Sequence, residues 1–169
     1  QSRNLMTVRT ASQVGMEPIV ETIQTMGIGK HEPYLSTALG AGTTTVEKIT
    51  NAYAMLANHG RALKPRVIDY AQDRRGKVIF PANWKPCEGC NKKDWDGRPM
   101  PRFAKSGKQL MDAITAYQVV HMLEGVVQRG TAVRLRDLGV PLFGKTGTTT
   151  GPNDVWFVGG TPDVVAGMY

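Results

Sequence analysis

Cysteine and aromatic residues are scarce in this sequence, and long apolar runs are absent from it. Two of its 169 residues are cysteine, and 7% are Phe, Trp or Tyr. No stretch approaches the roughly 18 uncharged apolar residues that a membrane-spanning helix needs. The opening QSRNLMTVRT has no basic start followed by an apolar core, so it does not read as a signal peptide. The 41% hydrophobic content excludes wholesale disorder and predicts a folded body.

Negative charge is in the minority, with 14 acidic residues against 21 basic ones and a net charge of +7. An excess of basic residues suggests three classes of partner: nucleic acid, an anionic membrane surface or an acidic substrate. Between residues 81 and 110, however, seven basic and three acidic residues fall in one loop-like stretch. Such a stretch is typical of a solvated face. Because aromatic and basic residues do not interleave on any one element, we expect no nucleic-acid partner.

The two cysteines, Cys87 and Cys90, lie together in C-E-G-C. A four-ligand zinc site is poorly supported, because there is no second cysteine pair and the three histidines are scattered. A redox motif is expected beside a βαβ pattern, whereas this pair lies in a proline-rich loop. We therefore expect no metal and no cofactor. A local disulfide in an oxidising compartment is favoured, with free thiols as the alternative.

Apolar residues at helical spacing predict three helices. The first covers residues 12–26, where Pro18 starts or kinks it. The second follows a capping box at Thr44–Glu47 and runs to Gly60. The third runs from Asp112 to the glycine at 130.

Period-two runs and turn residues predict the strands. Short runs at 66–70 and 77–80 flank Q-D-R-R-G, which is typical of a projecting hairpin, and a long aperiodic stretch follows them. The runs at 141–149, 155–160 and 164–169 are separated by turns, which favours an antiparallel meander. Helices followed by hairpin-connected strands predict an α+β fold.

Two short polar groups carry the chemistry: S-R-N at Ser2–Asn4 and K-T-G-T at Lys145–Thr148. Side chains alternate across a strand, so Thr146 and Thr148 face the same side. Gly147 between them lets another backbone approach closely. A strand of this kind can hold an extended peptide that ends in a carboxylate, through main-chain hydrogen bonds, the hydroxyls and the lysine charge.

Each of these residues also has an ordinary structural interpretation. Ser2 and Asn4 are residue types that cap helices. Lys145 on a strand is typical of a solvated edge charge. Asp154 and Trp156, which follow the next turn, are typical of a turn aspartate and a packing aromatic residue.

The order S-x-N, then helices, then K-T-G-T at the head of a β-meander resembles the transpeptidase domain of the penicillin-binding proteins. Three stretches are similar to the bifunctional class A enzymes in particular: ALGAGTTTVEKITNAYAMLANHGRALKP, TAYQVVHMLEGVVQRGTA and GKTGTTTGPNDVWFVGGTPDVVAGMY. The resemblance covers most of the chain and is thinnest in the loop that carries the cysteines. It implies the transpeptidase fold shared with serine β-lactamases.

One family motif is missing. The family acylates a serine in S-x-x-K, and none of the four serines here has a lysine three positions on. We therefore expect residues 1–169 to be the C-terminal part of one transpeptidase domain, with a projecting hairpin and loop insertion at about 65–109.

The resemblance implies that the complete protein cross-links peptidoglycan stem peptides through a serine acyl-enzyme and binds β-lactam antibiotics. It implies a place on the periplasmic side of the bacterial inner membrane, with attachment through an N-terminal anchor outside this sequence. A serine β-lactamase and a non-catalytic β-lactam or peptide sensor are the alternatives.

The resemblance also implies residue roles. Ser2 would pass a proton between the missing lysine, Lys145 and the leaving amine. Asn4 would hydrogen-bond the substrate's peptide carbonyl. Lys145 would supply positive charge, Thr146 and Thr148 would bind the substrate carboxylate, and the Thr148 backbone N–H would form half of the oxyanion hole.

Overall fold

The structure is a computed structural model that describes residues 2–81, 94, 97, 107–149, 151 and 153–169. The chain divides into two compact units, Gln1–Leu63 with Gly107–Tyr169, and Lys64–Ser106. Each unit is described by itself. In the first, helices precede an antiparallel sheet, so the predicted α+β class is confirmed. None of the helices in the described part of the chain is long and apolar enough to cross a membrane.

The first predicted helix is in fact two helices. They are α1 (Asn4–Val14) and α2 (Met16–Thr25), whereas the sequence predicted one helix over residues 12–26. Gly15 separates them, because its φ of 89° lies in the left-handed region that glycine adopts readily. Pro18 lies in the first turn of α2, where its missing N–H has no intrahelical partner to lose. The predicted boundary was wrong because it ignored the break at Gly15.

The second predicted helix is confirmed as α3 (Val46–Ala57). Its N-cap is Thr45, whose Oγ1 accepts the backbone N–H of Lys48 at 3.2 Å. Thr44, the first residue of the predicted capping box, instead donates its hydroxyl to the carbonyl of Ile28 at 2.8 Å. That bond ties the start of α3 to the segment that follows α2.

The third predicted helix is confirmed as α4 (Ala113–Arg129). The Asp112 carboxylate caps it by accepting two backbone N–H groups of the first turn, at 2.9 and 3.2 Å. Near the other end, Val126 and Val127 are buried and form a core cluster with Ala132. The cap and the apolar stripe are both visible in the sequence, which explains why this helix was predictable.

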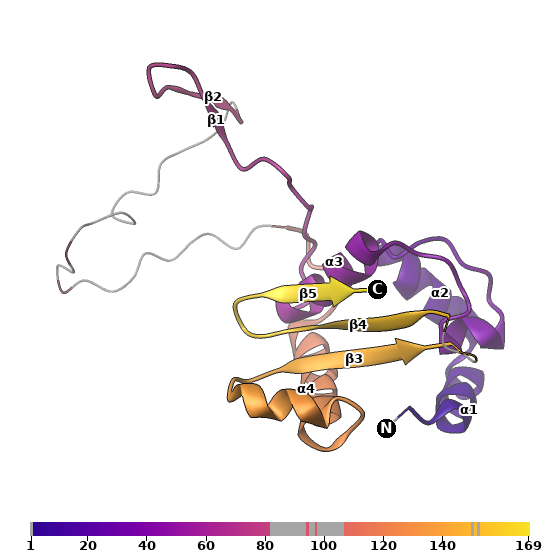
Figure 1. Ribbon diagram of the computed structural model, residues 1–169. Helices are drawn as coiled ribbons and strands as arrows, with labels where there is room; N and C mark the ends of the chain where they lie inside the picture. Colours follow the sequence, from indigo (N-terminus) through magenta and orange to yellow (C-terminus); the bar gives the residue numbers. More distant parts are fainter. Residues whose placement is uncertain (1, 82–93, 95–96, 98–106, 150, 152) are drawn as a thin grey trace. The chain divides into compact units, whose positions relative to one another are not determined.

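The predicted meander is confirmed as three antiparallel strands in the order β3-β4-β5 (Figure 1). The strands are β3 (Phe143–Thr148), β4 (Val155–Gly160) and β5 (Val165–Met168). Strand β3 pairs with β4 without a break in register, and Lys145 lies opposite Val158. Strand β3, which carries K-T-G-T, is therefore an outer strand of this sheet.

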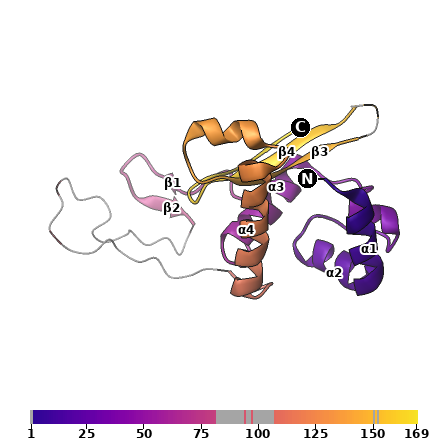
Figure 2. The same cartoon turned by 90° about the horizontal axis from the view of Figure 1, so that it is seen from below.

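The two faces of the sheet are covered differently. Figure 2 shows α3 and α4 on one face and the 3-10 helix η2 (Val133–Leu138) on the other. A second 3-10 helix, η1 (Leu35–Leu39), lies between α2 and α3 in the chain. Neither 3-10 helix was predicted from the sequence, because such short turns show no sustained period.

Helix α3 packs closely on β5 at Gly167. A Cβ at this position would contact the Thr50 side chain and lie 3.4 Å from Cγ1 of Val46. The Thr50 hydroxyl is buried there, with no hydrogen-bond partner among the described residues. The absence of a side chain at Gly167 is what allows this approach.

The second unit contains the predicted hairpin, with its first strand placed differently. Strands β1 (Ala71–Gln72) and β2 (Val78–Phe80) pair antiparallel. The Asp73 carboxylate accepts two backbone N–H groups of the turn, at 2.8 and 2.9 Å. The predicted strand at 66–70 was wrong: the ladder covers only residues beside this turn and is irregular between Ala71 and Gln72. Cys87 and Cys90 lie outside the described residues, so their disulfide stays a prediction.

Replacing Gly167 by Ala should lower the melting temperature of the chain, because the new Cβ overlaps the Thr50 side chain. Overpacking of this kind costs about 1–3 kcal/mol. Thermal unfolding followed by circular dichroism measures it. Adding Thr50→Ala to Gly167→Ala should recover part of the loss, since the hydroxyl is then gone. A melting temperature unchanged in G167A contradicts the close packing.

Candidate active site

The two polar groups found in the sequence meet in the structure. The Lys145 ammonium donates to the Ser2 hydroxyl at 2.6 Å, although the two residues are 143 positions apart. It also donates to the backbone carbonyl of Thr146 at 2.7 Å. Ser2 immediately precedes α1, and Lys145 is on β3. The interpretation of Lys145 as a solvated edge charge is wrong, because its ammonium is partly buried and holds two partners.

Burial changes the proton affinity of this lysine. Partial removal of the Lys145 ammonium from water disfavours its charged form and lowers its pKa below that of an ordinary lysine. A lysine with a lowered pKa gives up its proton more readily, so it is better suited to exchange protons with a neighbouring hydroxyl. Ser2 is that neighbour.

Strand β3 presents its backbone and its side chains in different directions. Just beyond the strand, the Thr149 N–H donates to the carbonyl of Asp154 across the hairpin at 3.1 Å, in the same register as β3 and β4. Backbone groups alternate along an antiparallel strand, so those of Lys145 and Gly147 also point to β4. The N–H and C=O of Thr146 and Thr148 therefore point to the outer edge of the sheet.

Gly147 allows the hairpin to close tightly. It lies opposite Trp156, and a Cβ at Gly147 would lie 3.3 Å from the Trp156 Cβ. This spacing is tighter than an ordinary side-chain contact, so a side chain here would require Trp156 to shift by a few tenths of an ångström. The sequence predicts that Gly147 allows the backbone of a ligand to approach, and in the structure Gly147 also allows close pairing with Trp156 of β4.

Asn4 has no direct contact of the kind that joins Ser2 to Lys145 among the described residues. It is the first residue of α1, and Arg3 is the N-cap, with no side-chain capping bond. The interpretation of Ser2 and Asn4 as helix caps is therefore wrong. Among the residues that the structure describes, the Asn4 side chain makes no hydrogen bond to Lys145 or to the K-T-G-T residues. Its role in substrate binding stays a prediction.

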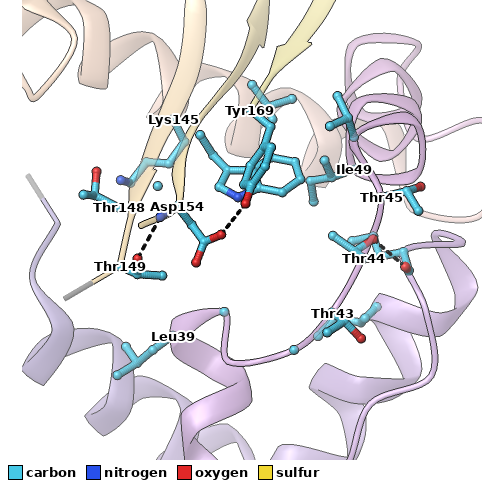
Figure 3. A pocket seen from close by; sticks show the side chains of 18 of the residues that line it. Leu39, Thr43, Thr44, Thr45, Ile49, Lys145, Thr148, Thr149, Asp154 and Tyr169 are labelled. Atoms are coloured by element: carbon cyan, nitrogen blue, oxygen red, sulfur yellow. Dashed lines mark hydrogen bonds between the residues drawn. The ribbon is translucent and has the colours of Figure 1, made fainter. Parts of the chain in front are cut away.

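A cavity of about 760 Å³ lies beside β3, between the sheet and the segments η1 and α3 (Figure 3). Lys145, Thr146, Gly147 and Thr148 all line it. Figure 3 shows Lys145 and Thr148 on the side of the sheet, with Leu39 across from them. Ile49 of α3 contributes an apolar wall. The cavity thus has a charged and hydroxylated rim along β3 and a largely apolar interior.

Three further lining residues form a connected group that sequence analysis did not assign to the site: Asp154, Trp156 and Tyr169. The Tyr169 hydroxyl donates to the Asp154 carboxylate at 2.6 Å, and this partner raises the pKa of Tyr169. The Trp156 and Tyr169 rings are tilted at 55° with centroids 4.8 Å apart. Asp154 also closes the β3–β4 turn, because its N–H donates to Thr149 Oγ1 at 3.1 Å. The hairpin register, with Gly147 opposite Trp156, is the signal that could have placed these residues.

Comparison with known proteins agrees with this geometry. The family model of the penicillin binding protein transpeptidase domain matches residues 1–166. Penicillin-binding protein 1A of Rickettsia bellii is 41% identical over 172 residues, which cover 100% of this chain and 22% of the relative. The chain therefore spans about a fifth of the length of such relatives.

Solved structures show the same fold. Penicillin-Binding Protein 1A from Haemophilus influenzae matches with a TM-score of 0.75 and 24% identity, over 94% of this chain and 27% of the other. Penicillin binding protein 3 from Mycobacterium tuberculosis, complexed with aztreonam, matches with a TM-score of 0.65 and 24% identity, over 99% and 42%. The chain belongs to the penicillin-binding protein transpeptidase family.

The Lys145 ammonium should titrate below the ordinary lysine value of 10.5, because burial disfavours its charged form. The test is an NMR titration of the chain after reductive methylation of its lysines with ¹³C-formaldehyde. The signal lost in Lys145→Arg identifies the residue. Its midpoint should return to the ordinary value in denaturant, where burial is lost. A midpoint at or above 10.5 in the folded chain contradicts the effect.

Proposed function

We propose that the full-length protein is a peptidoglycan DD-transpeptidase that cross-links stem peptides through a serine acyl-enzyme and is acylated by penicillin. The observation that carries the proposal is the bond from Lys145 Nζ to Ser2 Oγ, at the edge strand whose Thr146 and Thr148 backbone groups point outward. That arrangement combines a charge, a hydroxyl relay and outward-pointing backbone donors at one edge. The family match supports this chemistry.

In the proposed reaction, the oxygen of a serine outside this sequence attacks the carbonyl carbon of the penultimate D-Ala. The serine proton passes to a base, the peptide C–N bond breaks, and the terminal D-Ala leaves as an amine that takes up a proton. Ser2 lies 2.6 Å from Lys145 and can carry a proton between that lysine and the leaving nitrogen. An amine from a neighbouring stem peptide then displaces the serine oxygen and forms the cross-link.

Binding of the substrate's terminal carboxylate follows from the same strand. Carboxylates accept hydrogen bonds, and the hydroxyls of Thr146 and Thr148 are two residues apart on one side of β3. The Lys145 ammonium adds positive charge nearby. The Thr148 N–H points to the outer edge, where it can donate to the oxyanion of the tetrahedral intermediate. Asn4 would hold the substrate's peptide carbonyl.

The stem peptides and β-lactams are the proposed partners, and the periplasmic side of the inner membrane is the proposed location. One solved neighbour is complexed with aztreonam, a β-lactam, which supports the second partner.

A β-lactamase would hydrolyse the acyl-enzyme quickly, whereas a transpeptidase keeps it. Persistence of the penicillin adduct after removal of excess antibiotic therefore separates the two enzymes.

In the full-length protein, Lys145→Ala should slow acylation by fluorescent penicillin about 100-fold, because it removes charge at the reacting end of the ligand. Thr148→Ala keeps the backbone N–H and loses only a hydroxyl, so about tenfold slowing is expected. Lys48→Ala is the matched control, since Lys48 is exposed on α3 and does not line the cavity. Rates within threefold of the parent for both site variants would remove them from the site.

The 169-residue chain by itself should form no stable penicillin adduct, because it contains no S-x-x-K. Ser2 is assigned to proton transfer, without a covalent bond. Intact-mass spectrometry after incubation with excess penicillin measures the outcome, with the full-length protein as the positive control. A stoichiometric adduct that maps to Ser2 would show that these roles are wrong.

A further inference from the structure

Thr131 contacts the K-T-G-T strand, although it does not line the cavity described above. It follows α4 by two residues, and its Oγ1 lies 2.9 Å from Oγ1 of Thr146. Thr146 is the residue of the strand that is proposed to bind the substrate carboxylate. The contact joins a residue from the end of a helix to a side chain with a proposed binding role.

The backbone around Thr131 is held firmly. The N–H groups of Gly130 and Ala132 both donate to the carbonyl of Val126, at 3.1 and 3.2 Å. A Cβ at Gly130 would lie 2.7 Å from that same carbonyl oxygen, so only glycine permits this reversal. Ala132 is buried in the core cluster with Val126. Thr131 is therefore fixed on both sides and presents its hydroxyl from a defined place.

The proton count of the two hydroxyls determines what this contact can do. Each threonine has one O–H donor and two acceptor lone pairs, and either oxygen can be the donor in the bond between them. A carboxylate can only accept. If Thr146 donates to the substrate carboxylate, its single proton is used, and the bond to Thr131 must then run from the Thr131 O–H to the Thr146 oxygen.

We infer that Thr131 is a positioning residue for carboxylate recognition: its hydroxyl donates to Thr146 and so directs the Thr146 proton to the substrate's carboxylate. This rests on the proposed function. Hydrogen bonds in such a chain polarise one another, so the donation from Thr131 also strengthens the bond from Thr146 to the anion. The contribution belongs to binding of the anion, and it does not touch the reacting carbonyl.

The test uses the full-length protein and separates the dissociation constant of penicillin from the rate constant of acylation by stopped-flow kinetics. Thr131→Val removes the hydroxyl and keeps the shape. It should weaken penicillin binding about tenfold, as expected for a lost hydrogen bond in a charged network, with the acylation rate constant within threefold of the parent. Thr131→Ser keeps the hydroxyl and should bind within threefold of the parent. Thr115→Val makes the same chemical change in the first turn of α4 and should also bind within threefold.

Penicillin methyl ester distinguishes positioning from mere structural support, because it lacks the anionic carboxylate. The parent and Thr131→Val should react with the ester equally. Thr146→Val combined with Thr131→Val should weaken penicillin binding no further than Thr146→Val alone. Equal losses of Thr131→Val toward penicillin and its ester, or a loss confined to the acylation rate constant, would overturn the inference.

Folding and the parent's own activity are checked in the same experiment. Thr131→Ala is the second variant, because it places no methyl group against the Thr146 oxygen. Unfolding of both Thr131→Val and Thr131→Ala, seen by circular dichroism, assigns Thr131 to stability and contradicts the inference. If the parent forms no penicillin adduct, the proposed function fails and the inference with it. If the parent is acylated and the variants bind normally, only the inference fails.

Discussion

The bond between the Lys145 ammonium and the Ser2 hydroxyl connects the beginning of the chain to its C-terminal sheet. The ammonium also binds the carbonyl of Thr146, so it joins Ser2 to the strand that carries K-T-G-T. Partial burial makes its charge costly, and the hydrogen bonds to Ser2 and to the Thr146 carbonyl offset part of that cost. A partly buried ammonium that is hydrogen-bonded to a hydroxyl is suited to moving protons. The proposed acyl transfer requires this property of Lys145.

Four consecutive residues of strand β3, Lys145–Thr148, supply an ammonium, two hydroxyls and outward-pointing backbone groups. Its pairing with β4 leaves the backbone of Thr146 and Thr148 at the outer edge, while Lys145 and Gly147 face the opposite side of the sheet from the threonine side chains. Thr131 reaches Thr146 from the end of α4. The helix, the sheet and the first residues of the chain thus converge on one strand.

Much of this fold could be predicted because local signals agree with the tertiary structure. Residues close together in the sequence determine the Asp112 cap and the apolar stripe of α4. The same holds for the turns between the C-terminal strands. The break at Gly15 was missed because apolar spacing continues across it, and only the positive φ reveals it. Asp154 and Trp156 look like ordinary turn and packing residues until the tertiary structure places both against Tyr169. Thr131 shows the same limit, since its contact with Thr146 exists only once α4 has packed against β3.

The hydrogen bond from Lys145 to the Thr146 carbonyl has a consequence for the solubility of the protein. An outer strand with unpaired carbonyls is a template on which another polypeptide can add a strand, and such edges promote aggregation. Here the carbonyl at the middle of the K-T-G-T segment already has a donor, and that donor carries a charge that an incoming backbone would have to displace or bury. The edge therefore disfavours indiscriminate strand addition, while a peptide that ends in a carboxylate brings the counter-charge that compensates the ammonium.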